Sequence, residues 1–244
     1  MKGVVYFMDY EVMMNGNVKI GMFAPDFEAK TTMGDICLND YKGKWVILFS
    51  HPGDFTPVCT TEIIAFSKAN TYFEKINTCL LGLSVDSNAS HLAWIYDIYC
   101  KTGVKVPFPI IADRNGQIAR KYGMISNDVS NTETVRNVYI IDDKGIVRLI
   151  LVYPMNVGRS ISEILRALTA LQIADANGAS TPANWIPCEP VILPPPNTFL
   201  ELMKRNEQIE KQRNGMNWYL TFKKPKDCKL MESNNRINEK SKGE

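Results

Sequence analysis

Residues 45–62 read WVILFSHPGDFTPVCTTE, a short apolar run followed by two prolines and a cysteine. A continuous apolar run of this length is typical of a strand that is buried on both faces of a sheet. Thr56 and Pro57 then favour the start of a helix, as its N-cap and its first residue. The stretch therefore predicts a buried strand that leads into a helix, with Cys59 in the first helical turn.

Strands and helices alternate along most of the chain, which is typical of α/β proteins whose helices cover a sheet. The spacing of apolar residues predicts helices at 56–76, 87–103, 116–123 and 160–178. Apolar runs predict strands at 79–86 and 108–113, two more within 136–154, and an N-terminal hairpin at 26–40.

The composition changes after the last long helix, because six of the 18 residues at 180–197 are proline. So many prolines fit neither a helix nor a central strand. We therefore expect a boundary near residues 180–186, with a main domain at 18–180 and a C-terminal unit at 181–226. That unit is too small to bury a good core alone, and its expected elements are a strand at 189–193, a helix at 198–206 and a strand at 217–224. Residues 1–17 are expected to be an extension and residues 227–244 a disordered tail.

Charge and composition exclude several classes of function. With 28 basic and 26 acidic side chains, the net charge of +2 gives no reason to expect nucleic acid or an anionic membrane as partner. No apolar run approaches the roughly 18 residues that span a bilayer, and the N-terminus lacks the pattern of a secretory signal. The six cysteines include no Cys-x-x-Cys pair and the chain has only two histidines, so we expect no metal site and a reducing, cytoplasmic location.

The chemistry of Cys59 depends on whether its thiol ionises. An ordinary thiol is only about 3% thiolate at pH 7, and reaching about 90% requires about 3.4 kcal/mol of stabilisation. The first turn of a helix favours an anion, but a helix terminus rarely contributes more than about 1–2 kcal/mol. A cationic side chain must therefore help.

Arg136 and Arg159 are the candidates for that cation. Arg136 begins an expected inner strand, where a charged residue is unusual without a partner, and Arg159 directly precedes the last long helix. A guanidinium is always charged and donates to several acceptors at once. The spacing fits equally well with arginines that form ordinary ion pairs at strand ends.

A resemblance to a known family decides between these alternatives. PGDFTPVC at 52–59 is the Pro-x-x-x-Thr-x-x-Cys signature of the peroxiredoxins, and FSHPGDFTPVCTTE resembles their one-cysteine, peroxiredoxin-6-like branch. The likeness continues through LGLSVDSNASHLAW, FPIIAD, YGM and LVYPMNVGRSISEILR, and covers about residues 18–224. It implies a thioredoxin-like three-layer fold with an added N-terminal hairpin and a small α+β C-terminal unit.

The resemblance also implies a thiol-dependent peroxidase that reduces hydrogen peroxide and alkyl hydroperoxides in antioxidant defence. Cys59 would be the nucleophile and would form a sulfenic acid. Thr56 would orient the peroxide, Pro52 would shield the sulfur from water, and Arg136 would stabilise the thiolate and the transition state.

Three further residues receive supporting roles by resemblance. Glu62 would hold an arginine in place, and Arg159 would be that second arginine. His51 would be a neighbour of the site, for which a structural role is as good an explanation as a catalytic one. The resemblance implies no cofactor, and it implies a homodimer.

The chain departs from related branches at two places. Thr181, in STPANW, stands where two-cysteine relatives carry their resolving cysteine. Cys188 lies nearby and could resolve across a dimer, but we expect an external thiol, glutathione or thioredoxin-like, to reduce the sulfenic acid. Lys44 and Leu38 stand where some one-cysteine members carry a hydrolase-type serine and histidine, which disfavours a phospholipase activity.

Two other functions remain as alternatives from the residues alone. A cysteine-based acyl hydrolase would need His51 as a base within reach of Cys59. A peroxide sensor or chaperone-like oligomer would use the thiol only as a signal, without turnover. Consumption of peroxide with an external thiol over many cycles distinguishes the peroxidase from both.

Overall fold

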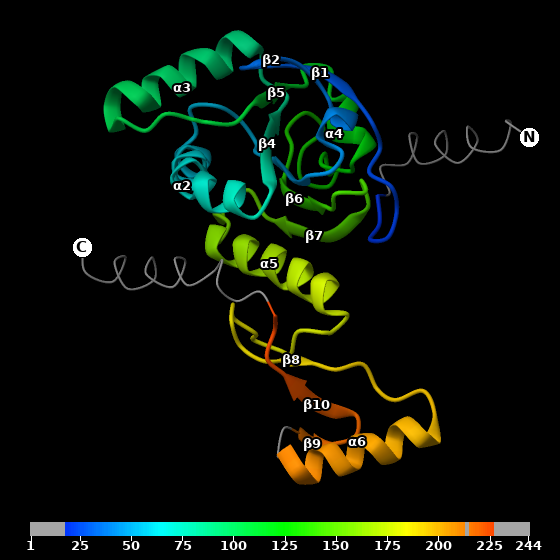
Figure 1. Cartoon of the computed structure of the whole chain (residues 1–244). Helices are drawn as coiled ribbons and strands as arrows, with labels where there is room; N and C mark the ends of the chain where they lie inside the picture. The colour runs from blue at the N-terminus through cyan, green and yellow to red at the C-terminus, as the bar shows by residue number, and fades with distance from the viewer. Residues whose placement is uncertain (1–17, 213–214, 227–244) are drawn as a thin grey trace, which may run out of the picture. The chain divides into compact units, whose positions relative to one another are not determined.

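The computed structural model describes residues 18–212 and 215–226 (Figure 1). The expected extension at 1–17 and the expected tail at 227–244 lie outside the described residues. The chain divides into two compact units, Met1–Ile161 and Ser162–Glu244. This division falls before the expected boundary near residue 180, so the long helix expected at 160–178 lies almost wholly in the second unit.

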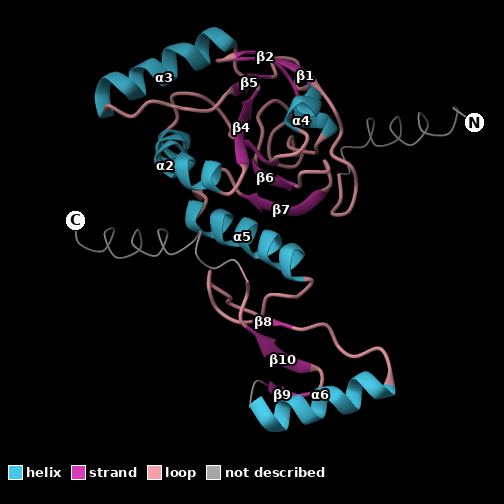
Figure 2. Cartoon of the chain, viewed as in Figure 1, coloured by secondary structure: helices cyan, strands magenta, loops and turns pink. Residues whose placement is uncertain are grey.

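The first unit is built on one mixed sheet of seven strands (Figure 2). Its strands are β1 (Glu28–Thr31), β2 (Gly34–Cys37), β3 (Trp45–Ser50), β4 (Thr78–Ser84), β5 (Ile110–Ala112), β6 (Arg136–Ile141) and β7 (Val147–Tyr153). The order across the sheet is β2-β1-β5-β4-β3-β6-β7. The central strands β3, β4 and β5 pair in parallel, whereas β6 and β7 continue the sheet in antiparallel pairs.

Helices lie on both sides of this sheet, as Figure 1 shows for α2 (Pro57–Lys75) and α3 (Asn88–Thr102) on one side and α4 (Gln117–Lys121) on the other. Successive side chains of β3 point to opposite faces, which explains why the whole strand is buried. Phe49 stacks on Phe66 of α2 on one face, with 4.1 Å between ring centroids. The layered α/β prediction is thereby confirmed, and so is the N-terminal hairpin formed by β1 and β2.

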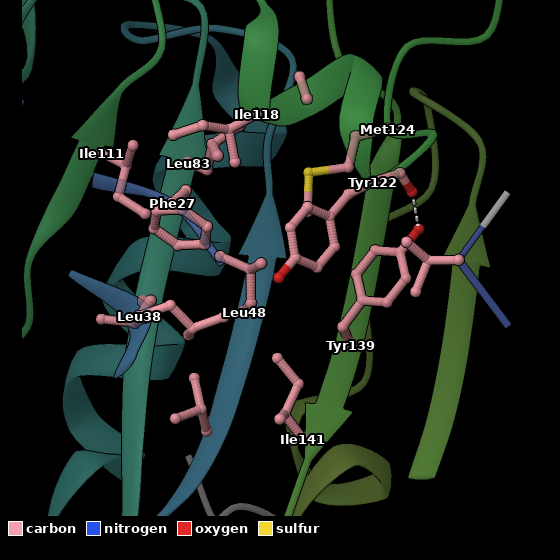
Figure 3. Close-up of a cluster of buried hydrophobic side chains, with 14 of the residues drawn as sticks. Phe27, Leu38, Leu48, Leu83, Ile111, Ile118, Tyr122, Met124, Tyr139 and Ile141 are labelled. Atoms are coloured by element: carbon pink, nitrogen blue, oxygen red, sulfur yellow. Dashed lines mark hydrogen bonds between the residues drawn. The ribbon is translucent and has the colours of Figure 1, made fainter. Parts of the chain in front are cut away.

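The opposite face of the sheet carries an apolar cluster of the first unit (Figure 3). Leu48 and Leu83 contribute to it from the central strands, and Tyr122 contributes from the segment after α4. The buried hydroxyl groups in the cluster are satisfied, because Tyr139 donates to the carbonyl of Tyr122 and Tyr122 donates to the carbonyl of Pro25. A close-packed cluster whose polar groups are hydrogen-bonded keeps the strands that contribute to it, and therefore their ends, in fixed positions.

The second unit contains α5 (Ile161–Asn177), α6 (Phe199–Gln212) and a three-stranded sheet in the order β8-β10-β9. Its strands are β8 (Val191–Ile192), β9 (Gly215–Asn217) and β10 (Leu220–Lys223). Its small core gathers Ala170 and Ile173 of α5 around Trp185 and Val191. The proline-rich stretch supplies the core residue Trp185, whose indole donates to the carbonyl of Glu189 at 3.0 Å.

Two predictions for this unit are wrong in detail. The helix expected at 198–206 extends to Gln212. The strand expected at 217–224 begins only at Leu220, as β10, and is preceded by a turn at Trp218 and Tyr219 and by β9. The turn is stabilised locally, because the backbone N–H of Trp218 donates to the side chain of Asn217. Within the described part of the chain, every helix is too short or too polar to cross a membrane.

Candidate active site

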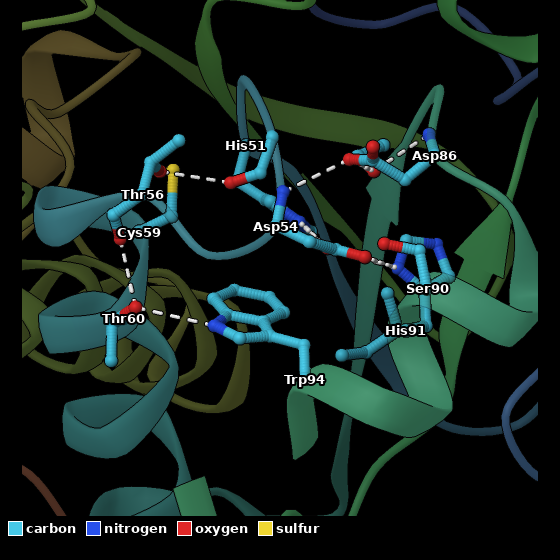
Figure 4. Close-up of polar contacts among 12 residues, drawn as sticks. His51, Asp54, Thr56, Cys59, Thr60, Asp86, Ser90, His91 and Trp94 are labelled. Carbon is cyan, nitrogen blue, oxygen red and sulfur yellow. Dashed lines mark hydrogen bonds and ion pairs between the residues drawn. The ribbon is translucent and has the colours of Figure 1, made fainter. Parts of the chain in front are cut away.

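Cys59 lies in the first turn of α2, directly after the loop that leaves β3 (Figure 4). Thr56 is the N-cap of the helix and Pro57 is its first residue, as the sequence predicted. The side chain of Cys59 is fully buried, and its thiol is free. Because the backbone N–H groups of a first turn have no helical partners, this position favours an anionic sulfur.

The loop that carries Thr56 is held in one conformation by its own contacts. The hydroxyl of Thr56 donates to the carbonyl of Gly53 at 2.8 Å and makes no capping bond to the helix. Phe55 adopts a positive φ of 56°, which is costly for a residue other than glycine and requires support from the surroundings. Pro52 is buried in the same loop, in agreement with a shielding role.

Arg136 donates a hydrogen bond to the sulfur of Cys59. Its Nη1 lies 3.3 Å from Sγ of Cys59 and 2.7 Å from Oε2 of Glu62. Its Nε and Nη2 donate to the carbonyl of Met155, at 2.9 and 2.6 Å. Four contacts fix the guanidinium of a residue that starts an inner strand and is buried, which explains why a charge is tolerated there.

Glu62 lies between the two arginines that the sequence singled out. Nε of Arg159 donates to its Oε1 at 2.8 Å and Nη2 donates to its Oε2 at 2.7 Å, a bidentate pair. The backbone N–H of Arg159 adds a third bond to Oε1. Burial would raise the pKa of Glu62, but the hydrogen bonds and charge of Arg159 and the charge of Arg136 hold that pKa below its usual value. Glu62 is therefore a carboxylate at neutral pH.

The remaining nitrogen of Arg159 joins two strand ends. Nη1 donates to the carbonyl of Ser50 at 2.8 Å and to that of Asn137 at 2.9 Å, at the point where β3 and β6 separate. The guanidinium also lies over the rings of Phe49 and Phe66, with centroid distances of 5.3 and 5.6 Å. Arg159 thus has a structural position behind Glu62, away from a direct contact with the sulfur.

The charges of this cluster determine what Cys59 can do. Two buried guanidinium groups, of Arg136 and Arg159, face one carboxylate, of Glu62. One positive charge is left over, and a buried charge without a partner is strongly unfavourable. A thiolate at Cys59, in hydrogen-bond contact with Arg136, would neutralise it. The arrangement therefore supports a nucleophilic sulfur.

His51 is the first residue of the loop after β3 and interacts with Asp54 of the same loop. Its Nε2 is 3.1 Å from Oδ1 of Asp54, and its Nδ1 has no hydrogen-bond partner among the described residues. His91 of α3 contacts the same carboxylate, so the three side chains form a cluster whose ligand-type atoms lie within 4.8 Å of one another. The sequence did not single out Asp54 or His91. Because the His51 ring pairs with Asp54 and not with Cys59, the geometry gives no support to an acyl hydrolase.

Cys188, the other candidate thiol, is disulfide-bonded, whereas the reducing location expected from the sequence predicts free thiols. Cys59 is free, so the structure contains no bond between these two sulfurs. Three more free cysteines are found in the described residues, at positions 37, 79 and 100. The thiol of Cys37 is partly buried near Asp26, and its desolvation together with that carboxylate raises the pKa of Cys37. It is therefore a poor nucleophile beside Cys59.

Family models match two parts of the chain. Residues 20–150 match the AhpC/TSA family, and residues 170–208 match the C-terminal domain of 1-Cys peroxiredoxin. Peroxiredoxin 2 of Caldanaerobacter subterraneus subsp. tengcongensis is 56% identical over 206 residues, which cover 84% of this chain and 93% of that protein. The peroxiredoxin of Methanocaldococcus jannaschii is 47% identical over 213 residues, covering 84% of this chain and 98% of that protein.

Solved structures agree with these relatives. A yeast mitochondrial 1-Cys peroxiredoxin, studied for its thiol resolving mechanism via the glutathione and thioredoxin systems, is 41% identical with a TM-score of 0.73. The match covers 85% of this chain and all of that one. A variant of peroxiredoxin 6 of Arenicola marina is 33% identical with a TM-score of 0.75, over 86% of this chain and all of that one.

Proposed function

The chain belongs to the peroxiredoxin family, as a member of the 1-Cys type and a thiol-dependent peroxidase, and on that premise we propose that Cys59 is its peroxidatic cysteine. The observation that carries the proposal is the 3.3 Å contact between Nη1 of Arg136 and Sγ of Cys59, inside a buried cluster with one uncompensated positive charge.

The reaction begins with attack of the Cys59 thiolate on the distal oxygen of the peroxide. The S–O bond forms as the O–O bond breaks, so that the sulfur becomes a sulfenic acid and the leaving oxygen departs as water or an alcohol after taking up a proton. Negative charge moves from sulfur to oxygen during this step. Arg136, fixed by Glu62 and Met155, remains beside that charge and stabilises it without reorganisation.

Thr56 and Pro52 shape the space in which the peroxide is held. Thr56 stands at the N-cap, where its hydroxyl can exchange the carbonyl of Gly53 for a peroxide oxygen. Pro52 is buried and has no N–H to offer a competing bond. Glu62 and Arg159 support Arg136 from behind. These roles follow the family pattern at matching positions, and the contacts within the first unit are compatible with them.

The sulfenic acid is proposed to be reduced by an external thiol, glutathione or thioredoxin-like, and no cofactor is needed. Thr181 leaves the usual resolving position without a thiol, and Cys188 is already disulfide-bonded. The substrates are proposed to be hydrogen peroxide and alkyl hydroperoxides, and the role to be antioxidant defence in the cytoplasm, where such thiols are supplied.

A homodimer is proposed as the functional form. Large apolar side chains of the second unit are exposed, among them Phe199, Leu200 and Met203 of α6 and Met216 and Tyr219 beyond it. Such a group of apolar residues is typical of surfaces that bind another chain. Sedimentation of the full chain at several concentrations tests this assembly, and a species that stays monomeric at high concentration contradicts it.

Mass spectrometry after one equivalent of hydrogen peroxide tests the assignment of the nucleophile. We expect one added oxygen on Cys59, which becomes a mixed disulfide when glutathione is present. Cys59→Ser should abolish peroxide consumption, whereas Cys188→Ser should retain turnover with an external thiol. A Cys59–Cys188 disulfide in the oxidised protein would overturn the one-cysteine mechanism. Sulfenic acid without turnover would favour the sensor, and ester hydrolysis without peroxide use would favour the hydrolase.

A further inference from the structure

Two histidines from different parts of the first unit, His51 and His91, meet at the buried carboxylate of Asp54 (Figure 4). His51 follows β3, Asp54 lies in the loop before α2, and His91 lies in α3. All three side chains are at most 1% exposed. None of them contacts Cys59 through a hydrogen bond, yet two of the three belong to the loop that positions Thr56 and the first turn of α2.

The partners of His91 determine its protonation. Nδ1 faces both oxygens of Asp54, at 3.0 and 2.9 Å, and Nε2 faces the carbonyl of Ile111 at 3.2 Å. A carboxylate and a carbonyl are both acceptors. Each ring nitrogen can make its bond only if it carries a proton, so the hydrogen bonding is complete only for the charged imidazolium form.

The other two members of the cluster are fixed in turn. Burial would raise the pKa of Asp54, but the hydrogen bonds from His51 and His91 hold that pKa well below its usual value. Burial lowers the pKa of His51. A neutral His51 must donate from Nε2 to the carboxylate, which leaves a lone pair on the buried Nδ1 that no described residue uses.

A second contact joins α3 to the beginning of α2. The indole of Trp94 donates to the hydroxyl of Thr60 at 3.2 Å, and that hydroxyl donates to the carbonyl of Thr56 at 2.8 Å. The Trp94 ring also lies 5.2 Å from the ring of His51, measured between centroids. The loop at 51–56 is thus held to α3 at two points, one of which depends on charge.

We propose that Asp54 and His91 are positioning residues of the peroxidase reaction. Charged His91 fixes the carboxylate of Asp54. Asp54 in turn fixes His51 as the Nε2–H tautomer and keeps the loop at 51–56 in its reactive conformation. The proposal rests on the assignment of Cys59 as the nucleophile. It adds a pH-dependent element, because loss of the His91 proton breaks the bond to Asp54 or the bond to Ile111.

The charged groups around this pair belong to several elements. Asp54 and His51 face His91 from the loop, and Asp86 after β4 accepts from the backbone N–H of Asp54 at 3.0 Å. Arg159 acts on His51 through its charge. Of these groups, Asp54 contacts the His91 ring directly, so a change in the charge of His91 acts first on the position of Asp54 and its loop.

Histidine-selective ¹⁵N NMR on the full untagged chain tests the protonation states, since the chain contains only two histidines and both lie in this cluster. At neutral pH we expect one imidazolium and one neutral ring protonated on Nε2. Two neutral rings, or two charged rings, would overturn the proposal. This measurement does not depend on peroxide chemistry, so it can fail while the role of Cys59 stands.

Kinetics of Cys59 oxidation by hydrogen peroxide test the positioning role. His91→Leu and Asp54→Asn should slow oxidation by about 10- to 100-fold, because displacement of a reactive loop by about 1 Å has effects of that size. His91→Asn keeps a donor at the place of Nδ1 and should recover much of the rate at neutral pH, but without the wild-type decline at the pH where the imidazolium signal disappears. Asp97→Asn, at an exposed ion pair on the same helix, is the matched control and should leave the rate unchanged.

If His91 only stabilised the fold, the kinetic test would give a different result. His91→Leu would then lower the thermal midpoint, while the rate of Cys59 oxidation measured well below that midpoint, where the variant is folded, stayed at the wild-type value. That outcome, or a His91→Asn variant with the wild-type pH profile, would contradict the proposal.

Discussion

Nη1 of Arg136 lies 3.3 Å from Sγ of Cys59, and the same nitrogen donates to Glu62 at 2.7 Å. A single nitrogen of Arg136 therefore contacts both the sulfur of Cys59 and the carboxylate of Glu62 that holds this arginine in place. This geometry makes the ionisation of the sulfur depend on Arg136 more directly than on Arg159, whose guanidinium bonds to Glu62 and to backbone carbonyls.

Replacement of Arg136 by leucine should reduce the fraction of Cys59 present as thiolate at neutral pH. A hydrogen bond to a charged group contributes about 1.5–3 kcal/mol, so the rate of reaction with hydrogen peroxide should fall by about 10- to 150-fold. Ultraviolet absorbance of the thiolate and stopped-flow oxidation measure the two quantities. Arg148→Gln, which removes a partly exposed arginine paired with the buried Asp142 of the first unit, serves as the control. An unchanged thiolate signal in Arg136→Leu would remove the role given to this arginine.

Glu62→Gln should be among the most destabilising single changes in the first unit. It leaves two buried guanidinium groups without their carboxylate, and removing one member of a buried ion pair costs about 3–5 kcal/mol. Chemical denaturation at neutral pH measures the loss. Glu163→Gln removes a carboxylate from a partly exposed pair with Arg166 and should cost about 1 kcal/mol or less. Equal effects of the two substitutions would show that the buried network contributes little.

The same carboxylate predicts how stability depends on acid. Its pKa is lower in the folded protein than in the unfolded chain, so the unfolded chain binds more protons as the pH falls. The stabilisation from Glu62 is complete above the unfolded pKa of about 4.3 and is lost as the pH falls through the lower, folded value. Unfolding free energies measured from pH 6 to pH 3 should decline less steeply in Glu62→Gln than in the wild type.

His51 predicts a second decline at higher pH. Burial lowers its pKa in the folded protein, so below the unfolded value of about 6.5 the unfolded chain takes up a proton that the folded protein does not. Stability should fall by up to about 1.4 kcal/mol per pH unit in this window. Denaturation curves from pH 7.5 to pH 5 of the wild type and of His51→Asn measure the difference. A wild type with constant stability across the window would contradict a neutral, buried His51.

Gly82→Ala should destabilise the first unit and disturb the site. A Cβ at Gly82 would lie 3.3 Å from Cζ of Phe49, and that ring cannot move freely because it stacks on Phe66 and lies under the Arg159 guanidinium. Overpacking of this kind costs about 1–3 kcal/mol. Thermal unfolding checks the stability, and the oxidation rate of Cys59 reports any displacement of Arg159. Gly103→Ala cannot serve as the control, because Gly103 has a positive φ of 72°. Ala93→Gly or Ala89→Gly, both within helix α3, would instead measure the effect of helix propensity on stability.

Much of the first unit follows from local pattern. The apolar run before His51 and the Thr56-Pro57 pair locate β3 and the start of α2, since burial and capping are properties of neighbouring residues. Arg136 could be singled out because a charge at the start of an inner strand requires a partner. Thr56 is the N-cap residue, as predicted, but its hydroxyl makes no capping bond: it donates to the carbonyl of Gly53, whereas a capping oxygen accepts from a backbone N–H of the helix.

The rest depends on contacts between distant residues. Asp54 and His91 are 37 positions apart, and neither has an unusual local setting that would reveal the pairing. The turn that separates β9 from β10 depends on strand pairing within the small sheet, which the alternation of side chains alone does not indicate. The state of Cys188 likewise follows from a covalent bond, and connectivity between cysteines cannot be deduced from their spacing.

The bonds from Arg159 to the carbonyls of Ser50 and Asn137 have a consequence for protein engineering. Arg136 can be replaced in order to introduce new chemistry at the N-terminus of α2, because the only backbone group that its side chain contacts among the described residues is the carbonyl of Met155. Replacement of Arg159 would instead remove the hydrogen bonds that join the ends of β3 and β6. Libraries that randomise the pocket should therefore hold Arg159 and Glu62 constant and explore the remaining positions.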